Sequence, residues 1–144
     1  MRIVFDTNIL VRTFISPRGP ANEALEAILA GNHRLLLSIE ILQESMRVLR
    51  KPLMSLLHGK TEDDLYGFRV RLLQNVEMVL LNPLLTGPVR DPNDIVILQT
   101  TLSGNADAIC TFDRDFFTPP ASDFLALRKI AVLTDAQLLQ RLRQ

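Results

Sequence analysis

Short apolar runs alternate with longer segments of helical periodicity along this 144-residue chain. The runs are brief, rich in aliphatic residues and bounded by polar or turn-forming residues, which is typical of buried strands. They predict strands at residues 2–5, 35–37, 76–81, 107–111 and 129–133. The segments between them predict helices over residues 7–14, 21–29, 39–49, 61–74 and 94–102, with a last helix that opens at Thr134.

Polar residues and prolines mark where several of these helices begin and end. Ser38 is a candidate N-cap for residues 39–49, and Pro52 should end that helix. Thr134 and Gln137 form a capping-box pattern at the start of the C-terminal helix. Residues 82–92 contain three prolines and one glycine, and they predict a loop.

Strands that alternate with helices in this way indicate a parallel sheet covered by helices on both faces. We therefore expect an α/β fold, a three-layer α/β/α sandwich whose central sheet has four or five mostly parallel strands. The length fits one domain over residues 1–144, and no repeat, low-complexity segment or long linker divides it.

Six acidic residues stand where predicted strands end or where the following helices begin. They are Asp6, Glu44, Asp91, Asp94, Asp113 and Asp115. Ligands of open parallel α/β sheets bind beyond the carboxyl ends of the strands, so one edge could gather four of the six. These four are Asp6, Glu44, Asp94 and Asp113. Carboxylates brought together repel one another unless a cation lies between them, and clustered hard oxygen ligands predict Mg²⁺ or Mn²⁺.

Two pairs leave the choice of ligand open at this point. Asp91 precedes Pro92 and stands three residues before Asp94, which favours Asp91 as the helix N-cap and Asp94 as the ligand. Asp113 and Asp115 compete for one position after the fourth predicted strand. Each carboxylate alone also has an ordinary interpretation as a cap, loop or surface residue. Their recurrence at strand ends is what argues for a site.

Three polar neighbours could support these carboxylates. Asn8 is close enough in sequence to Asp6 to hydrogen-bond a carboxylate or a water molecule there. Thr111 ends its strand beside Asp113 and could orient that carboxylate or a phosphate oxygen. Ser38 is foremost a helix cap, and it could also support the site from behind.

The composition limits the cellular compartments and the binding partners that we expect for this protein. Basic and acidic residues are balanced at 16 each, which argues against a uniformly basic nucleic-acid coat but allows a local basic patch. Candidate phosphate contacts are Arg12, Arg18, Arg47, Arg50, Lys51 and Arg114. The single cysteine excludes an intrachain disulfide, and neither a signal-peptide pattern nor a membrane-length apolar run is present. We expect a cytoplasmic protein with no membrane association.

Other catalytic chemistries lack their residues. Cys110 lies in an apolar strand, and His33 and His58 show no metal-ligand spacing to each other or to Cys110. The chain has no Gly-x-Ser-x-Gly nucleophile motif, no phosphate-binding Walker loop and no dinucleotide fingerprint.

Taken together, the acidic motifs resemble those of the PIN domain. The matching segments are Asp6-Thr7-Asn8 after an apolar strand, Ser38 followed by Glu44, Arg90-Asp91-Pro92-x-Asp94, and Thr111-x-Asp113-Arg114-Asp115-Phe116. The resemblance covers nearly the whole chain, and the order and spacing of the motifs are more specific than any one of them. The chain is most similar to the PIN-type toxins of bacterial and archaeal toxin–antitoxin pairs, which are VapC-like ribonucleases.

This resemblance implies a metal-dependent endoribonuclease that hydrolyses RNA phosphodiester bonds as the toxin of a toxin–antitoxin pair. It makes Asp6, Glu44, Asp94 and Asp113 the catalytic positions that hold Mg²⁺ or Mn²⁺, with polar support from Asn8 and Thr111. It also implies an RNA substrate, a homodimer and a protein antitoxin. Divalent ions of this kind activate water and stabilise phosphoryl charge, so no side-chain nucleophile is required.

Three other functions stay open. A stand-alone PIN nuclease of RNA processing would have the same site without an antitoxin. An aspartyl-phosphate phosphatase would use Asp6 as its nucleophile, but it needs a second aspartate where this chain has Asn8, and a mid-chain lysine. A non-catalytic RNA- or protein-binding PIN-like module would keep the fold, but an unneeded cluster of repelling carboxylates would destabilise it.

Overall fold

A five-stranded sheet with the order β3-β2-β1-β4-β5 organises the computed structural model, which describes all 144 residues. All four strand pairs are parallel. The strands are β1 (Arg2–Phe5), β2 (Arg34–Leu37), β3 (Glu77–Met78), β4 (Ala108–Cys110) and β5 (Ala131–Leu133). The predicted α/β class with a parallel central sheet is confirmed.

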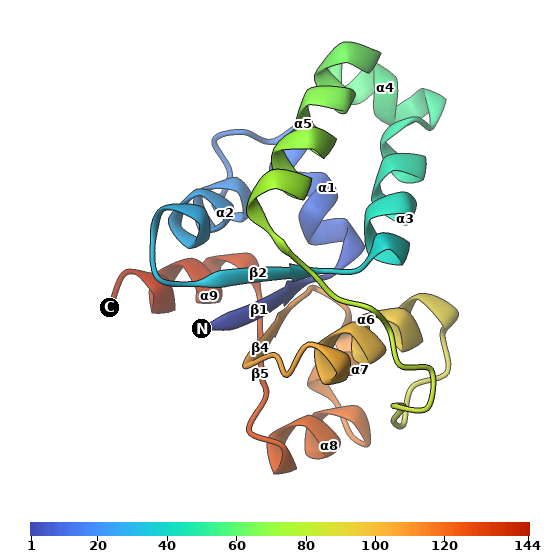
Figure 1. Ribbon diagram of the computed structural model, residues 1–144, viewed down its shortest axis with the longest axis vertical. Coiled ribbons are helices and arrows are strands. Elements are labelled where there is room, and N and C mark those ends of the chain that lie inside the picture. The colour runs from blue at the N-terminus through green and yellow to red at the C-terminus, as the bar shows by residue number, and fades with distance from the viewer.

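Helices lie on both faces of this sheet (Figure 1). On one side are α1 and α2, with α9 packed against α2, and α6, α7 and α8 are on the other side. α3, α4 and α5 extend beyond the α1 side, where α3 and α4 contact α1. The helices are α1 (Thr7–Ile15), α2 (Pro20–Ala30), α3 (Ile39–Leu49), α4 (Pro52–His58), α5 (Glu62–Asn75), α6 (Pro92–Ser103), α7 (Arg114–Phe117), α8 (Ala121–Leu127) and α9 (Asp135–Leu142).

The strand order changes direction beside β1. After β1, the chain adds β2 and β3 on one side and then returns to add β4 and β5 on the other. In the register, Val4 pairs with Leu36 of β2 and with Ile109 of β4. Connections that leave in opposite directions open a crevice at the carboxyl ends of β1 and β4, where parallel α/β sheets bind their ligands.

Helices on both faces explain why β1 and β2 each contain three consecutive apolar residues after an initial arginine, instead of apolar residues at alternate positions. Ile3, Val4 and Phe5 of β1 are completely buried, and residues 35–37 of β2 are almost completely buried. They belong to a cluster of 32 buried apolar residues. None of the helices combines the length and the apolar character needed to cross a membrane.

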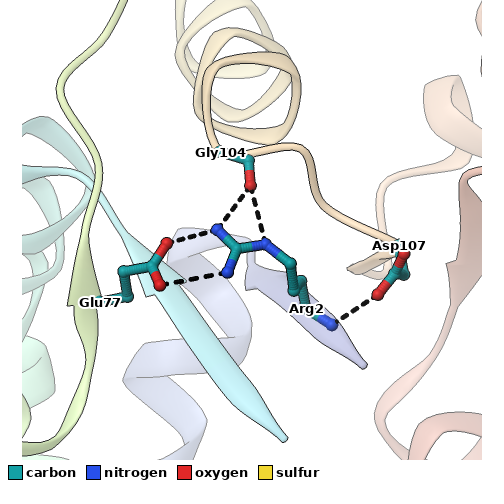
Figure 2. A network of polar contacts seen from close by, with 4 residues as sticks. All are labelled: Arg2, Glu77, Gly104 and Asp107. Atoms are coloured by element: carbon teal, nitrogen blue, oxygen red, sulfur yellow. Dashed lines mark hydrogen bonds and ion pairs between the residues drawn. The ribbon is translucent and has the colours of Figure 1, made fainter.

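A polar network fixes the opposite end of the sheet, as Figure 2 shows. The Arg2 guanidinium spans β2 and forms a two-pronged ion pair with Glu77 of β3. Its Nε and Nη2 also donate to the Gly104 carbonyl at 3.0 and 2.7 Å, just beyond α6, and the Arg2 backbone N–H donates to Asp107 at 2.8 Å. Hydrogen bonds from Arg2 lower the pKa of the Glu77 carboxyl. The network joins β1, β3 and the turn between α6 and β4.

The structure differs from the sequence prediction in two kinds of element. β3 has two residues where residues 76–81 were expected to form a strand, because the chain leaves the sheet after Val79 and exposes Leu80. The short helices α4, α7 and α8 were not predicted. Pro52 ends α3 as expected, but it also occupies the first turn of α4, where a missing N–H has no cost.

Gly104 should tolerate no side chain. An added Cβ would lie 2.8 Å from Leu36 Cδ1 and 3.0 Å from Val79 Cγ2. Leu36 is a core residue that cannot move freely, so we expect Gly104→Ala to lower the free energy of unfolding by about 1–3 kcal/mol. The matched control is Gly67→Ala in α5, where nothing lies within 4 Å of the added Cβ.

The control should have the opposite sign, because alanine in an open helical position stabilises by about 0.5–1 kcal/mol relative to glycine. Urea unfolding of both variants measures the two effects. Equal stability of Gly104→Ala and the parent would contradict the close packing described for this turn.

Candidate active site

A cavity of about 310 Å³ lies at the carboxyl ends of the central strands, where the change in strand order places a crevice. Six of the nine residues singled out from the sequence line it, and five of the six are acidic. The complete lining is Asp6, Thr7, Asn8, Glu44, Val48, Asp91, Asn93, Asp94, Phe112 and Asp113. The remaining three, Ser38, Thr111 and Asp115, lie behind or beside the cavity.

Asp6 leaves the end of β1 with its carboxylate free for the cavity. It occupies the N-cap position of α1, but its side chain makes no capping hydrogen bond. Instead, Thr111 Oγ1 donates to Asp6 Oδ2 at 2.7 Å and accepts the Asp113 backbone N–H at 2.9 Å. Thr111 therefore orients the Asp6 carboxylate. It contacts Asp113 only through the backbone N–H of that residue, and not through its carboxylate. Burial raises the pKa of Asp6, the Thr111 hydrogen bond opposes the rise, and the Asp113 charge adds to it.

Asp91 and Asp94 occupy different positions at the start of α6. Asp91 is the N-cap, and its carboxylate accepts the Asn93 backbone N–H at 2.8 Å. Asp94 lies one turn further, is only 5% exposed and faces the cavity. Burial raises the pKa of Asp94 to about 7, together with a hydrogen bond to Asp113 and the charges of Asp113, Asp91 and Asp6. The expected role of Asp91 as a cap is confirmed, although its charge also reaches the cavity.

Asp113 and Asp115 both contribute to the acidic group. One carboxylate oxygen each of Asp94, Asp113 and Asp115 can lie within 4.8 Å of the others, so these three could hold a metal ion. Asp113 lines the main cavity and also caps α7 by accepting the Asp115 backbone N–H at 2.9 Å. Asp115 is exposed and lines a neighbouring cavity of about 280 Å³ that shares Asp91 and Asp94 with the first.

Glu44 reaches the same cavity from α3. Its carboxylate is already paired, because Arg47 Nε and Nη2 donate to it at 2.9 and 2.6 Å. These hydrogen bonds lower the pKa of Glu44, in contrast to the raised values at Asp6 and Asp94. Glu44 therefore stays ionised at neutral pH and contributes a charge whose nearest partner is Arg47.

Ser38 connects the helices that carry two of these carboxylates. It caps α3 by accepting the Ile41 backbone N–H at 3.4 Å, and its hydroxyl also accepts from Thr100 Oγ1 of α6 at 3.0 Å. All atoms of Ser38 are buried. The bond fixes α3, which carries Glu44, against α6, which carries Asp94.

Two features near the cavity were missed in the sequence. Phe112 lines the cavity wall with 41% of its surface exposed, and Arg12 of α1 lies over its ring. Asp135, the residue after the capping residue Thr134, is buried beside Arg12. The position of Phe112 could have been inferred from the sequence, because an aromatic residue stands between two candidate site residues, Thr111 and Asp113. The packing of Arg12 against Asp135 could not, because it depends on tertiary structure.

Comparisons with known proteins identify the family of this chain. The chain matches the family model of the PIN domain over residues 2–115, and it therefore belongs to the PIN domain family. No curated protein matches the chain. Among solved structures, it is similar to a chain of VapBC2 from Rickettsia felis bound to a DNA fragment from their promoter. The TM-score is 0.63 at 16% identity, over 93% of this chain and 98% of that one, which shows a shared fold.

Asp91 should affect stability through its cap. We expect Asp91→Ala to lower the free energy of unfolding by about 0.5–2 kcal/mol, because the Asn93 N–H loses its acceptor. Asp91→Asn keeps an acceptor at the N-cap and should unfold like the parent. Urea denaturation measures the stability of both variants, and an RNA-cleavage assay measures their activity separately. An Asp91→Ala variant that is inactive but fully stable would show that the charge, and not the cap, is what the site requires.

Asp94 should make the metal-free protein less stable as the pH rises. Its pKa is raised in the folded state, so the folded protein keeps a proton that the unfolded chain loses above about pH 4. The stability present at low pH is therefore lost between about pH 4 and 7. Asp94→Asn removes this titration, so its stability relative to the parent should increase by a few kcal/mol from pH 5 to pH 8 in EDTA. A difference that does not change with pH would contradict the crowding of carboxylates around Asp94.

Proposed function

We propose that this protein is a metal-dependent endoribonuclease that hydrolyses RNA phosphodiester bonds within a single PIN domain. The observation that carries the proposal is the convergence of Asp6, Asp94 and Asp113 on one cavity, where burial and the neighbouring carboxylates raise the pKa of Asp94 to about 7. A cluster of this kind requires protons or a cation between its members.

The donor set fits Mg²⁺ or Mn²⁺. It consists of carboxylate oxygens, without the sulfur or imidazole ligands that favour zinc or copper. Asp6, Glu44, Asp94 and Asp113 would hold the ion, and Asp115 could join Asp94 and Asp113 around it. When bound, such an ion lowers the pKa of water and stabilises negative charge on phosphoryl oxygens.

Residues of the chain itself would orient the metal-binding carboxylates and bind the phosphate or a water molecule. Thr111 holds the Asp6 carboxylate in position, and the exposed amide of Asn8 can donate to a phosphate oxygen or a water molecule at the cavity wall. The lining contains no serine, cysteine, histidine or lysine. This supports hydrolysis by water over a covalent intermediate, and it argues against the phosphatase alternative, which needs a lysine beside its aspartate.

We further propose that the protein is the toxin of a toxin–antitoxin pair, which acts in the cytoplasm as a homodimer and is neutralised by a protein antitoxin. The fold shared with a chain of VapBC2 supports this assignment. A stand-alone RNA-processing nuclease is the alternative. Expression of the protein alone should stop growth, and an adjacent small gene for a DNA-binding antitoxin should restore it. Unaffected growth without any such gene would favour the alternative.

Cleavage should depend on the acidic cavity. We expect the purified protein to cleave single-stranded RNA with Mg²⁺ or Mn²⁺ and to stop in EDTA. Asp6→Asn should lower the rate at least about 100-fold, because even residues that only support metal ligands cost 10–100-fold. The matched control is Asp123→Asn, an exposed aspartate of α8 outside the cavity, which should keep parental activity.

Two results would overturn this assignment. Full activity of Asp6→Asn would exclude Asp6 as a metal ligand. A stable phospho-enzyme at Asp6 would support the phosphatase alternative.

Metal binding should also be visible without any substrate. An ion that binds only the folded protein stabilises it by mass action, by about 2.7 kcal/mol at a hundredfold excess over its Kd. The melting temperature should therefore rise with Mg²⁺ or Mn²⁺ beyond the effect of NaCl at equal ionic strength. Asp94→Asn should melt higher than the parent in EDTA and show a smaller metal-induced rise. A lower melting temperature with an unchanged metal response would mean that Asp94 holds no ion.

A further inference from the structure

We infer that Phe112 and Arg12 form a stacking platform for one unpaired base beside the acidic cavity, and that this platform selects single-stranded over duplex RNA. The inference rests on the proposed nuclease function, because it assigns a neighbouring nucleotide of the same substrate to this surface. It concerns recognition and not the hydrolysis step.

Phe112 is placed where a nucleotide next to the cleaved phosphate would lie. It stands between Thr111 and Asp113, and it lines the acidic cavity. Phe112 is 41% exposed although its neighbour Thr111 is completely buried. An exposed aromatic ring in a polar cavity offers a flat apolar surface, and unpaired bases stack on such surfaces in many RNA-binding proteins.

Arg12 is held against this ring by a buried carboxylate. The Arg12 guanidinium carbon lies 4.4 Å from the centre of the Phe112 ring, and its Nη1 lies 3.8 Å from Asp135 Oδ2. Asp135 is only 3% exposed, and Oδ2 has no hydrogen-bond partner in the structure. Because a buried carboxylate is strongly destabilised without a cation, Asp135 keeps the guanidinium in this place. The Arg12 side chain is still 52% exposed, so its remaining N–H groups can reach a phosphate.

Arg12, Phe112 and Asp135 extend the site toward the β5 side of the sheet. Arg12 lies on α1 after β1, Phe112 follows β4, and Asp135 begins α9 after β5. The platform is therefore on the β5 side of the cavity, whereas Glu44 approaches from the β2 side. An RNA strand with a phosphate at the acidic group could place its next base on the face of the Phe112 ring that Arg12 does not cover. A base in a duplex is already paired and stacked, so it cannot present its face to the ring.

The test separates recognition from cleavage by measuring binding in an inactive background. The probe is a fluorescently labelled single-stranded RNA, alone or annealed to its complement, and the background is Asp6→Asn with Mg²⁺. Phe112→Ala should raise the Kd for the single strand about 5- to 150-fold, the usual loss for a base–aromatic stack. The Kd for the duplex should change less than twofold. Phe112→Trp should retain single-strand affinity, and Phe112→Leu should bind as weakly as Phe112→Ala.

Two control variants match the exposure and the chemistry of the platform. Phe117→Ala removes a ring that is 39% exposed but lies outside the acidic cavity. Arg128→Ala removes a second arginine that stacks on an aromatic ring, at 3.5 Å from the centre of Phe124. Both should leave the Kd of both probes unchanged, whereas Arg12→Lys, which keeps the charge but loses the flat guanidinium, should weaken single-strand binding.

The outcomes distinguish this inference from the proposed function. If the parent cleaves RNA but Phe112→Ala binds the single strand as tightly as its background, the platform is excluded and the nuclease assignment stands. If the parent cleaves nothing but single-strand binding depends on Phe112, the platform stands and the hydrolysis proposal fails. Parental affinity in Phe112→Leu, or equal losses for single strand and duplex, would overturn the inference.

Discussion

Repulsion between the carboxylates at the carboxyl ends of β1 and β4 is the constraint on which the rest of the site depends. Like charges interact more strongly where little water screens them, and Asp94 is almost completely buried. The positive end of the α6 dipole and the Thr111 hydrogen bond each favour one ionised carboxylate, but burial and the neighbouring charges still raise the pKa of Asp6 and of Asp94. The fold therefore holds these carboxylates together at a cost in free energy.

Such a site requires a rigid frame, and one short strand supplies much of it. Asp6 follows β1 directly and lines the same cavity as Asp94 in the first turn of α6, whereas Arg2 at the other end of β1 binds the carbonyl just beyond the last turn of α6. Both ends of α6 therefore lie beside residues at the two ends of one strand. The Ser38–Thr100 hydrogen bond holds α3 against α6 from the side. Because α6 also packs against β1, the positions of Asp6 and Asp94 depend on the contact between this helix and this strand.

The sequence predicted the features that depend on local pattern. The continuous apolar strands, the Asp91 and Ser38 caps and the placement of Asp6, Glu44, Asp94 and Asp113 around one cavity were all predictable from spacing. The pairing of Glu44 with Arg47 and the position of Arg12 over Phe112 were not, because alternative partners of a long arginine side chain are decided by tertiary packing. The short helix α4 was hidden by Pro52, since a proline marks the end of one helix and the start of another with equal force.

The outer strands of the sheet are its shortest: β3 has two residues and β5 has three. An edge strand exposes unpaired N–H and C=O groups in proportion to its length, and long exposed edges invite other chains to add strands. Neither edge of this sheet offers enough backbone for a stable ladder. The short edge strands therefore disfavour self-association of this chain by β-augmentation.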